Sequence, residues 1–242
     1  QFDIIIKLDA DGQMNPDLIP QLIAPIVKGE AEAVKGNRFT SLDHIVGMPL
    51  IRILGNLALS FLSKLSTGYW ELFDPTNGFM AFKASVLNKI RMDKVDDRYF
   101  FESDLLFQCA LANICFEQLA MQSIYRQELS SLQPKNEIAR FIKRHLINFS
   151  KRIIYQYFIL DFNIGTLELL GFTFSSLLLS IVSIKVYLDG AVNQAYATPG
   201  SANLVSLLAI ITVQMLIGFL YFDATQQPLA RRRSKIHYHI HN

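Results

Sequence analysis

The sequence contains few cysteines, a single tryptophan and a small net charge. Each of these features excludes some classes of protein. Two cysteines among 242 residues, Cys109 and Cys115, cannot build the framework of a disulfide-rich secreted domain. We interpret both as buried small hydrophobic residues in a reducing compartment. A formal net charge of +2 is too small to indicate a nucleic-acid partner. Hydrophobic residues, by contrast, make up 51% of the chain, which directs attention to membrane segments.

The N-terminal part alternates between strand-like and helix-like patterns. Because the chain begins at Gln1, inside a strand-like run, we expect the native protein to extend further in this direction. Residues 2–8 are apolar and β-branched, as in a buried strand. Residues 15–17 form a helix-start signature, and helical spacing follows as far as Gly29. With a second strand over residues 31–34, this order predicts an α/β fold with a parallel sheet.

Two long apolar segments near the C-terminus, residues 164–188 and 203–222, each reach the length of about 20 residues that a membrane-spanning helix needs. The segment that joins them, residues 189–202, contains no lysine or arginine. Basic residues flank the two outer ends instead: Lys151, Arg152, Arg231, Arg232, Arg233 and Lys235. The positive-inside rule therefore predicts a two-helix hairpin with the N-terminal domain and the tail in the cytoplasm.

These patterns divide the chain into an α/β domain (1–136), a basic amphipathic segment (137–161), two membrane helices (162–223) and a basic tail (224–242). The basic segment suits the anionic headgroups of a cytoplasmic membrane surface. The alternative is a solvated helix whose other face packs on the domain. Residues 45–67 are also apolar at helical spacing, and we expect them to lie in the membrane interface or beneath the domain.

Three oxygen-bearing side chains follow the first predicted strand at alternate positions. If the backbone stays extended, Asp9, Asp11 and Gln13 project to the same side. Carboxylate and amide oxygens suit a hard divalent cation, with water and phosphate oxygens completing its coordination. Since ligands of open α/β sheets bind at the carboxyl ends of strands, we predict a metal site in this loop.

The order of the motifs resembles a known enzyme family. The Asp-x-Asp-x-Gln loop, a Gly-x-Arg at 36–38 and Asp-x-Thr-Asn-Gly-Phe at 74–79 resemble family 2 glycosyltransferases of the GT-A fold. Residues 98–104 and the C-terminal hairpin resemble the branch that contains dolichol-phosphate-mannose-synthase-like and bacterial polyprenyl-phosphate enzymes. The resemblance extends over the whole chain and implies an N-terminally truncated GT-A domain followed by a membrane hairpin.

The resemblance implies transfer of a sugar, with inversion, from a nucleotide-diphosphate sugar to a polyprenyl- or dolichyl-phosphate lipid at the bacterial inner membrane. Asp9, Asp11 and Gln13 would hold Mg²⁺ or Mn²⁺ against the donor diphosphate, and Asp9 would also contact the donor. Arg38 would meet a phosphate, since its planar fork binds phosphate bidentately; an exposed arginine at a strand end is the alternative. Arg52 is a second phosphate candidate, or a side chain that snorkels from an interfacial helix.

The resemblance also implies an acceptor-side loop and an acid. Asp74, which is also a catalytic candidate, and Asn77 would bind sugar or acceptor, and Gly78 would allow close backbone approach, although a plain Asp-Pro turn is the alternative. Glu102 and Asp104 occupy the position of a catalytic base, with Asp104 favoured. A lipid phosphate is already ionised, so these acids could instead position groups or cap a helix. A homo-oligomer is left open.

Two other functions compete with this interpretation. The first is a polysaccharide synthase of the same family, but those enzymes carry a Gln-x-x-Arg-Trp motif before their membrane helices and the only tryptophan here is Trp70. The second is a catalytically silent membrane scaffold or a partner of a lipid-linked-sugar flippase. The joint presence of Asp9, Asp11, Gln13 and Arg38 argues against that second reading.

Overall fold

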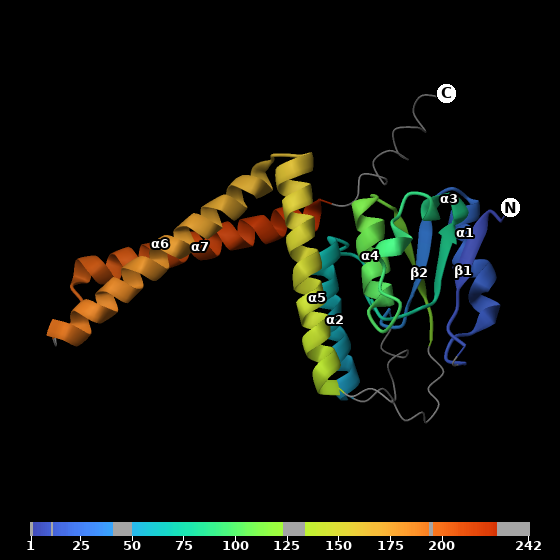
Figure 1. The fold of residues 1–242 in the computed structure, drawn as a ribbon, viewed down its shortest axis with the longest axis horizontal. Helices are drawn as coiled ribbons and strands as arrows, with labels where there is room; N and C mark the ends of the chain where they lie inside the picture. The colour runs from blue at the N-terminus through green and yellow to red at the C-terminus, as the bar shows by residue number, and fades with distance from the viewer. Residues whose placement is uncertain (1, 11, 41–49, 123–133, 194–195, 227–242) are drawn as a thin grey trace. The chain divides into compact units, whose positions relative to one another are not determined.

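The structure, a computed structural model, describes residues 2–10, 12–40, 50–122, 134–193 and 196–226. These residues fall into two compact units, one that extends to Arg152 and one that comprises Ile153–Gln226. The first unit is an α/β domain, and the second is dominated by two long helices (Figure 1). The predicted combination of an α/β domain with a helical hairpin is confirmed.

A mixed four-stranded sheet forms the centre of the first unit. In spatial order its strands are β1 (Ile4–Lys7), β3 (Met80–Lys83), β2 (Ala33–Asn37) and β4 (Phe116–Ala120). β1 and β2 are both antiparallel to β3, so they run in the same direction, and β4 is parallel to β2. The predicted parallel sheet is therefore wrong at its centre. β1 and β2 are consecutive strands in the sequence, but β3 lies between them in the sheet and pairs with both.

Helices cover both faces of this sheet (Figure 1). On one face, Val34 and Ala81 pack with Leu22 and Ile26 of α1 (Ile19–Val27). The predicted helix start is a 3₁₀ turn, η1 (Pro16–Leu18), in which the side chain of Asn15 accepts a hydrogen bond of 3.0 Å from the backbone of Asp17. The alternation of side chains along β2 and β3 sends their neighbours to the other face.

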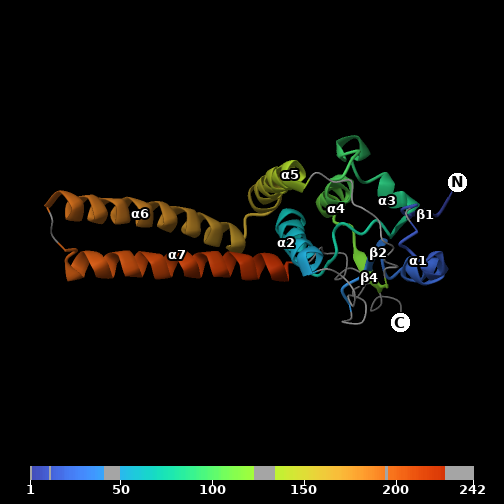
Figure 2. The same ribbon diagram turned by 90° about the horizontal axis from the view of Figure 1, so that it is seen from below.

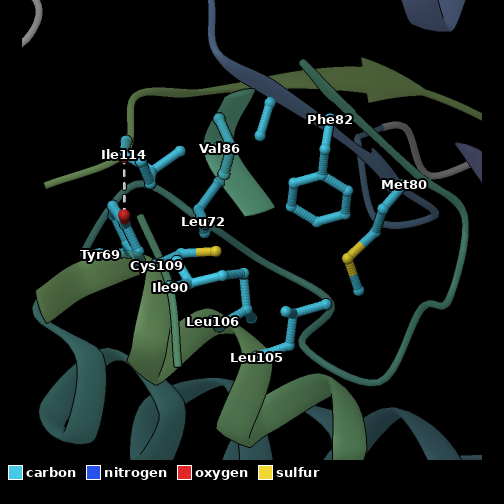
Figure 3. Close-up of a cluster of buried hydrophobic side chains, with 11 residues drawn as sticks. Tyr69, Leu72, Met80, Phe82, Val86, Ile90, Leu105, Leu106, Cys109 and Ile114 are labelled. Carbon is cyan, nitrogen blue, oxygen red and sulfur yellow. Dashed lines mark hydrogen bonds between the residues drawn. The ribbon is translucent and has the colours of Figure 1, made fainter. Parts of the chain in front are cut away.

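On that other face, β3 packs against α4 (Phe101–Leu111), as Figure 3 shows. Met80 and Phe82 share a fully apolar cluster with Leu105 and Leu106. The hydroxyl of Tyr69 closes one end of this cluster by donating 2.6 Å to the carbonyl of Ile114. Two short helices, α3 (Ala84–Leu87) and η3 (Met92–Lys94), complete the connection from β3 to α4.

Two further helices, α2 (Leu50–Thr67) and α5 (Pro134–Ile154), lie side by side in both ribbon views (Figures 1 and 2). Ser66 Oγ lies 2.9 Å from Nδ1 of the buried His145, and the Arg152 guanidinium donates 2.8 Å to the carbonyl of Leu65. Burial lowers the pKa of His145 to about 4, so this imidazole is neutral and serves as a packing element.

The arginines of α5 also bind α4 and the loop before it. Arg140 Nη2 lies 3.0 Å from Asp96 Oδ2, and Arg144 Nη1 lies 2.5 Å from Asp96 and 3.1 Å from Asp104. The lysines of the segment are exposed: Lys143 and Lys151. For its arginines the structure supports the alternative of a helix packed on the domain, because buried carboxylates on the domain attract them inward.

The second unit contains a π-helical turn, η4 (Tyr155–Leu160), followed by α6 (Ile164–Asn193) and α7 (Pro199–Thr225). Among the described residues, two helices are long and apolar enough to cross a membrane, Ile164–Val192 and Pro199–Thr225. They pack antiparallel, with Gly171 beside Met215 and Gly218 beside the carboxylate of Glu168. The small glycines let the two helices approach closely along this seam.

Candidate functional site

The candidate residues gather at one edge of the sheet. Since β3 runs opposite to β1 and β2, its N-terminal end lies at the edge where those two strands end. Asp9 follows β1, Arg38 follows β2, and Asn77 and Gly78 precede β3. Motifs separated by up to 69 positions are thereby brought to the same edge, as expected for a ligand site of an open α/β sheet.

Arg38 and Asp74 form a bidentate ion pair within this edge. Arg38 donates from Nε to Asp74 Oδ2 and from Nη2 to Asp74 Oδ1, each at 2.6 Å, and its backbone N–H donates to Oδ2 at 3.2 Å. The Asp74 side chain is fully buried. Burial alone would raise the pKa of this carboxyl, but its bonds to Arg38 outweigh that effect and lower it. Asp74 is therefore an ionised carboxylate that fixes the guanidinium plane of Arg38.

Side-chain hydrogen bonds fix the conformation of the loop that carries Asp74. Asp74 adopts the left-handed backbone region, with φ of 57°. The amide of Asn77 donates to the carbonyl of Gly36 at 3.0 Å and to Asp74 at 3.3 Å, and its oxygen accepts from the backbone of Phe79 at 3.0 Å. Asn56 of α2 donates to Asp74 at 3.4 Å. Asn77, expected from the sequence to bind substrate, thus has a bracing position inside the loop.

Gly78 lies directly beneath the Asp9 side chain. A Cβ atom at this position would collide with the Asp9 carboxylate, 2.7 Å from its Cγ, and with the ammonium of Lys7. Contacts under about 3.0 Å are essentially never made by real Cβ atoms. The close approach that a glycine permits here is therefore that of Asp9 and Lys7 to the backbone of the loop at residues 74–79.

Lys7, at the end of β1, joins two of the predicted site residues. Its Nζ lies 2.6 Å from Asp9 Oδ1 and 2.9 Å from Glu102 Oε1, and 5.7 Å from the ring centre of Phe101. Burial lowers the pKa of this lysine, but the bonds to both carboxylates more than compensate and raise it. The sequence analysis did not predict Lys7 as a site residue. The sequence feature that could have indicated it is a positive charge in an apolar strand, two positions before Asp9.

Lys35 is a second cation that the sequence did not single out. It lies in the middle of β2, is completely buried, and donates a hydrogen bond to the backbone carbonyl of Asn77. Burial lowers its pKa to about 8, against the opposing attraction of Asp74 and Glu102. The sequence could have indicated this residue, because a lysine in a strand whose other residues are buried needs a partner inside the protein.

The two acids of α4 point to different surroundings. Glu102 reaches the sheet edge through Lys7, whereas Asp104 accepts from Asn148 of α5 at 2.7 Å and from the backbone of Asp96 at 3.1 Å. Arg144 completes the binding of Asp104. The structure therefore brings Glu102 together with Asp9 and places Asp104, the acid favoured from the sequence, in the contact between α4 and α5. Helix capping by these acids is not seen, because both lie inside α4.

The remaining predicted residues are only partly described. Asp11 lies outside the described residues, as does the side chain of Arg52, whose backbone belongs to α2. Gln13 is partly buried in the loop after β1 and makes an interaction there. Within the described ranges, which omit Asp11, three or more acidic, histidine or cysteine residues do not gather as a metal site. The predicted metal set is thus represented by Asp9 and Gln13.

Comparison with known proteins finds a protein family and several enzymes that resemble this chain. The family model described as "Glycosyl transferase family 2" matches residues 1–91. A UDP-N-acetylglucosamine–dolichyl-phosphate N-acetylglucosaminyltransferase of Methanococcus voltae is 33% identical over 125 residues, which cover 52% of this chain and 49% of that protein. An undecaprenyl-phosphate mannosyltransferase of Micrococcus luteus is 29% identical over 110 residues, 45% of this chain and 44% of that protein.

Among solved structures, a glucosyl-3-phosphoglycerate synthase from Mycobacterium tuberculosis, crystallised with Mn²⁺, UDP and glucosyl-3-phosphoglycerate, is similar with a TM-score of 0.44 and 19% identity. The match covers 63% of this chain and 50% of that one. The chain spans about half the length of the curated relatives it matches. The matched residues contain β1, β2, β3 and the loops that bear Asp9, Arg38 and Asp74. The resemblance seen in the motifs is therefore confirmed, since residues 1–91 match the model of glycosyl transferase family 2.

Proposed function

We propose that this chain is part of a membrane-bound glycosyltransferase that transfers a sugar from a nucleotide-diphosphate sugar to a polyprenyl- or dolichyl-phosphate lipid. The observation that carries the proposal is the meeting of Asp9, the Arg38–Asp74 pair and Gly78 at the carboxyl edge of the sheet. The family match supports the reaction class. The names of the relatives, a dolichyl-phosphate and an undecaprenyl-phosphate transferase, support a lipid phosphate as the acceptor.

The donor set at this edge fits a divalent cation. Asp9 and Glu102 carry two negative charges and the Lys7 ammonium balances only one, so a net negative charge remains at these oxygens to attract a cation. Asp9, Asp11 and Gln13 would hold Mg²⁺ or Mn²⁺, which prefer such oxygen ligands. When bound there, the ion would neutralise charge that develops on the departing diphosphate.

Arg38 would contribute to the same stabilisation from the protein side. Its guanidinium is oriented by the buried Asp74 carboxylate, so a phosphate would meet a preformed donor group and would not need to order a flexible side chain. A lipid phosphate is ionised at neutral pH and can attack without losing a proton first. A base at Glu102 would then have little proton transfer to perform, and its part would be the positioning of Lys7 and Asp9.

The hairpin formed by α6 and α7 supports a membrane location. Two helices of sufficient length and apolarity follow the domain, and the segment between them lacks lysine and arginine. By the positive-inside rule the domain and the tail would face the cytoplasm, where soluble nucleotide sugars are available. The acceptor phosphate of a membrane lipid would lie at the same surface.

The test is an assay of membranes that contain this chain, supplied with labelled nucleotide sugars and polyprenyl phosphate. We expect label in the lipid extract, its loss on chelation by EDTA, and a decrease of about 100-fold for Asp9→Asn, because one electrostatic stabiliser of the transition state is lost. Asp17→Asn, which neutralises an exposed acid eight positions later, is the matched control. Equal activity in the two variants would remove the metal role, and label in polymer instead of lipid would favour a polysaccharide synthase.

A further inference from the structure

The ammonium of Lys7 lies between two carboxylates, one of which, Asp9, belongs to the proposed metal set. It lies 2.6 Å from Asp9 Oδ1 and 2.9 Å from Glu102 Oε1. Asp9 and Glu102 come from parts of the chain 93 positions apart, and without a cation their charges would repel each other. Lys7 is therefore the group that holds these two acids together.

The position of Lys7 is set by the sheet. Lys7 and Lys35 are both register partners of Met80, so the three side chains form a row across β1, β3 and β2 on the face toward α4. Gly78, two positions before Met80, leaves the space in which the Lys7 ammonium and the Asp9 carboxylate meet. Lys7 is thus the last residue of strand β1, whereas Asp9 belongs to the loop that follows.

We propose that Lys7 is a resident counter-ion, which a divalent metal has to displace from Asp9, so that metal binding also releases Glu102. The inference deepens the proposed function and rests on its metal site. One carboxylate oxygen of Asp9 is bound to the ammonium and the other lies next to Gly78, so a metal that takes the ammonium-bound oxygen has to replace this ion pair. A dication within a few ångströms of an ammonium is also repelled by it.

If Lys7 competes with the metal, replacing it should increase the affinity of the site for the metal. Lys7→Gln removes the competing charge and retains a polar side chain of similar length. We expect the purified full chain in detergent to bind Mn²⁺ alone, measured by electron paramagnetic resonance, about five- to tenfold more tightly than the wild type. A residue that only supported the fold would weaken binding when replaced. Lys89→Gln, which breaks the exposed pair with Glu32, is the matched control and leaves the affinity unchanged.

The outcomes separate this inference from the proposed function. Mn²⁺ binding by the wild type that is lost in Asp9→Asn, without a gain in Lys7→Gln, overturns the counter-ion role alone. Absence of binding in the wild type and in Lys7→Gln overturns both, since no metal is then held off. Binding that appears only in Lys7→Gln supports the counter-ion role.

A second measurement uses the wild-type chain and does not depend on a variant folding. An amine-reactive ester modifies free lysines faster than ion-paired ones, and mass spectrometry reports each lysine separately. We expect saturating Mn²⁺ to increase the modification rate of Lys7 and to leave that of Lys89 unchanged. A Lys7 rate that stays constant or falls at saturating Mn²⁺ overturns the displacement.

Discussion

Two charged clusters share the carboxyl edge of the sheet, and they differ in how they are held. In the cluster of Arg38, Asp74 and Asn77, the carboxylate is fully buried and accepts hydrogen bonds from Arg38, from Asn77 and from Asn56 of α2. In the cluster of Lys7, Asp9 and Glu102, the Asp9 side chain is 38% exposed and a single ammonium makes both ion pairs.

The difference indicates a division of labour. A buried bidentate pair with additional hydrogen bonds is costly to break, and so it is suited to keep one geometry throughout a reaction. A partly exposed ammonium is screened by solvent and can be exchanged at small cost. The first cluster is therefore the frame of the site, and the second is the part in which ligands are expected to replace protein contacts.

The largest effect is expected when the frame is broken. Asp74→Asn removes the negative charge that compensates the guanidinium of Arg38 and the buried ammonium of Lys35. We expect the free energy of unfolding of the domain to fall by about 3–5 kcal/mol, as for other buried pairs that lose one partner. Denaturant or thermal unfolding in detergent measures this loss. Asp93→Asn, in the exposed pair with Arg91, is the control and should leave the midpoint of the unfolding transition unchanged. Equal midpoints for the two variants would refute the stabilising role of the Arg38–Asp74 pair.

A smaller effect on stability, but a large one on activity, is expected where the clusters meet. Gly78→Ala places a methyl group against Asp9 and Lys7 and displaces the exchangeable cluster while Arg38 and Asp74 remain paired. A displacement of about 1 Å at a catalytic group can reduce turnover about 100-fold, which the lipid-label assay would detect. Gly55→Ala on α2, whose methyl group would meet open space, should retain full activity. A fully active Gly78→Ala chain would mean that the position of Asp9 is not critical.

The smallest effect concerns pH and sharpens the description of the frame. Folding lowers the pKa of Lys35 from 10.5 to about 8. Between these values the unfolded chain binds the proton and the folded chain does not, so raising the pH favours the folded state. We expect the wild type to gain stability relative to Lys35→Met between pH 8 and 10, by about 1 kcal/mol or more. Unfolding transitions of both chains across this range provide the test, and parallel curves would show that Lys35 does not titrate there.

Much of the architecture could be predicted because its signals are local. The apolar lengths of α6 and α7 and the break between them lie within single stretches of sequence, as does the strand-loop pattern that places Asp9 and Arg38 at strand ends. Side-chain alternation and strand direction then bring those loops to one edge. The hairpin and the predicted edge of the site follow from such local rules.

The remaining features depend on contacts between distant parts of the chain. The insertion of β3 between β1 and β2 and the pairing of Lys7 with Glu102, 95 positions away, have no local signature. The different surroundings of Glu102 and Asp104 likewise depend on α5, since Asn148 and Arg144 bind Asp104 and leave Glu102 to pair with Lys7. The sequence analysis favoured Asp104, but the contacts that distinguish the two acids come from elements distant in the sequence.

The inward orientation of the arginines on α5 has a consequence for the solubility of the domain. With Arg140 and Arg144 committed to Asp96 and Asp104, the opposite side of the helix exposes apolar residues, each between 42% and 57%: Ile138, Ile142 and Leu146. Such a contiguous surface promotes association of chains in water. A shortened protein that ends after α5 would lack the hairpin and still require detergent or a fusion partner to stay monodisperse.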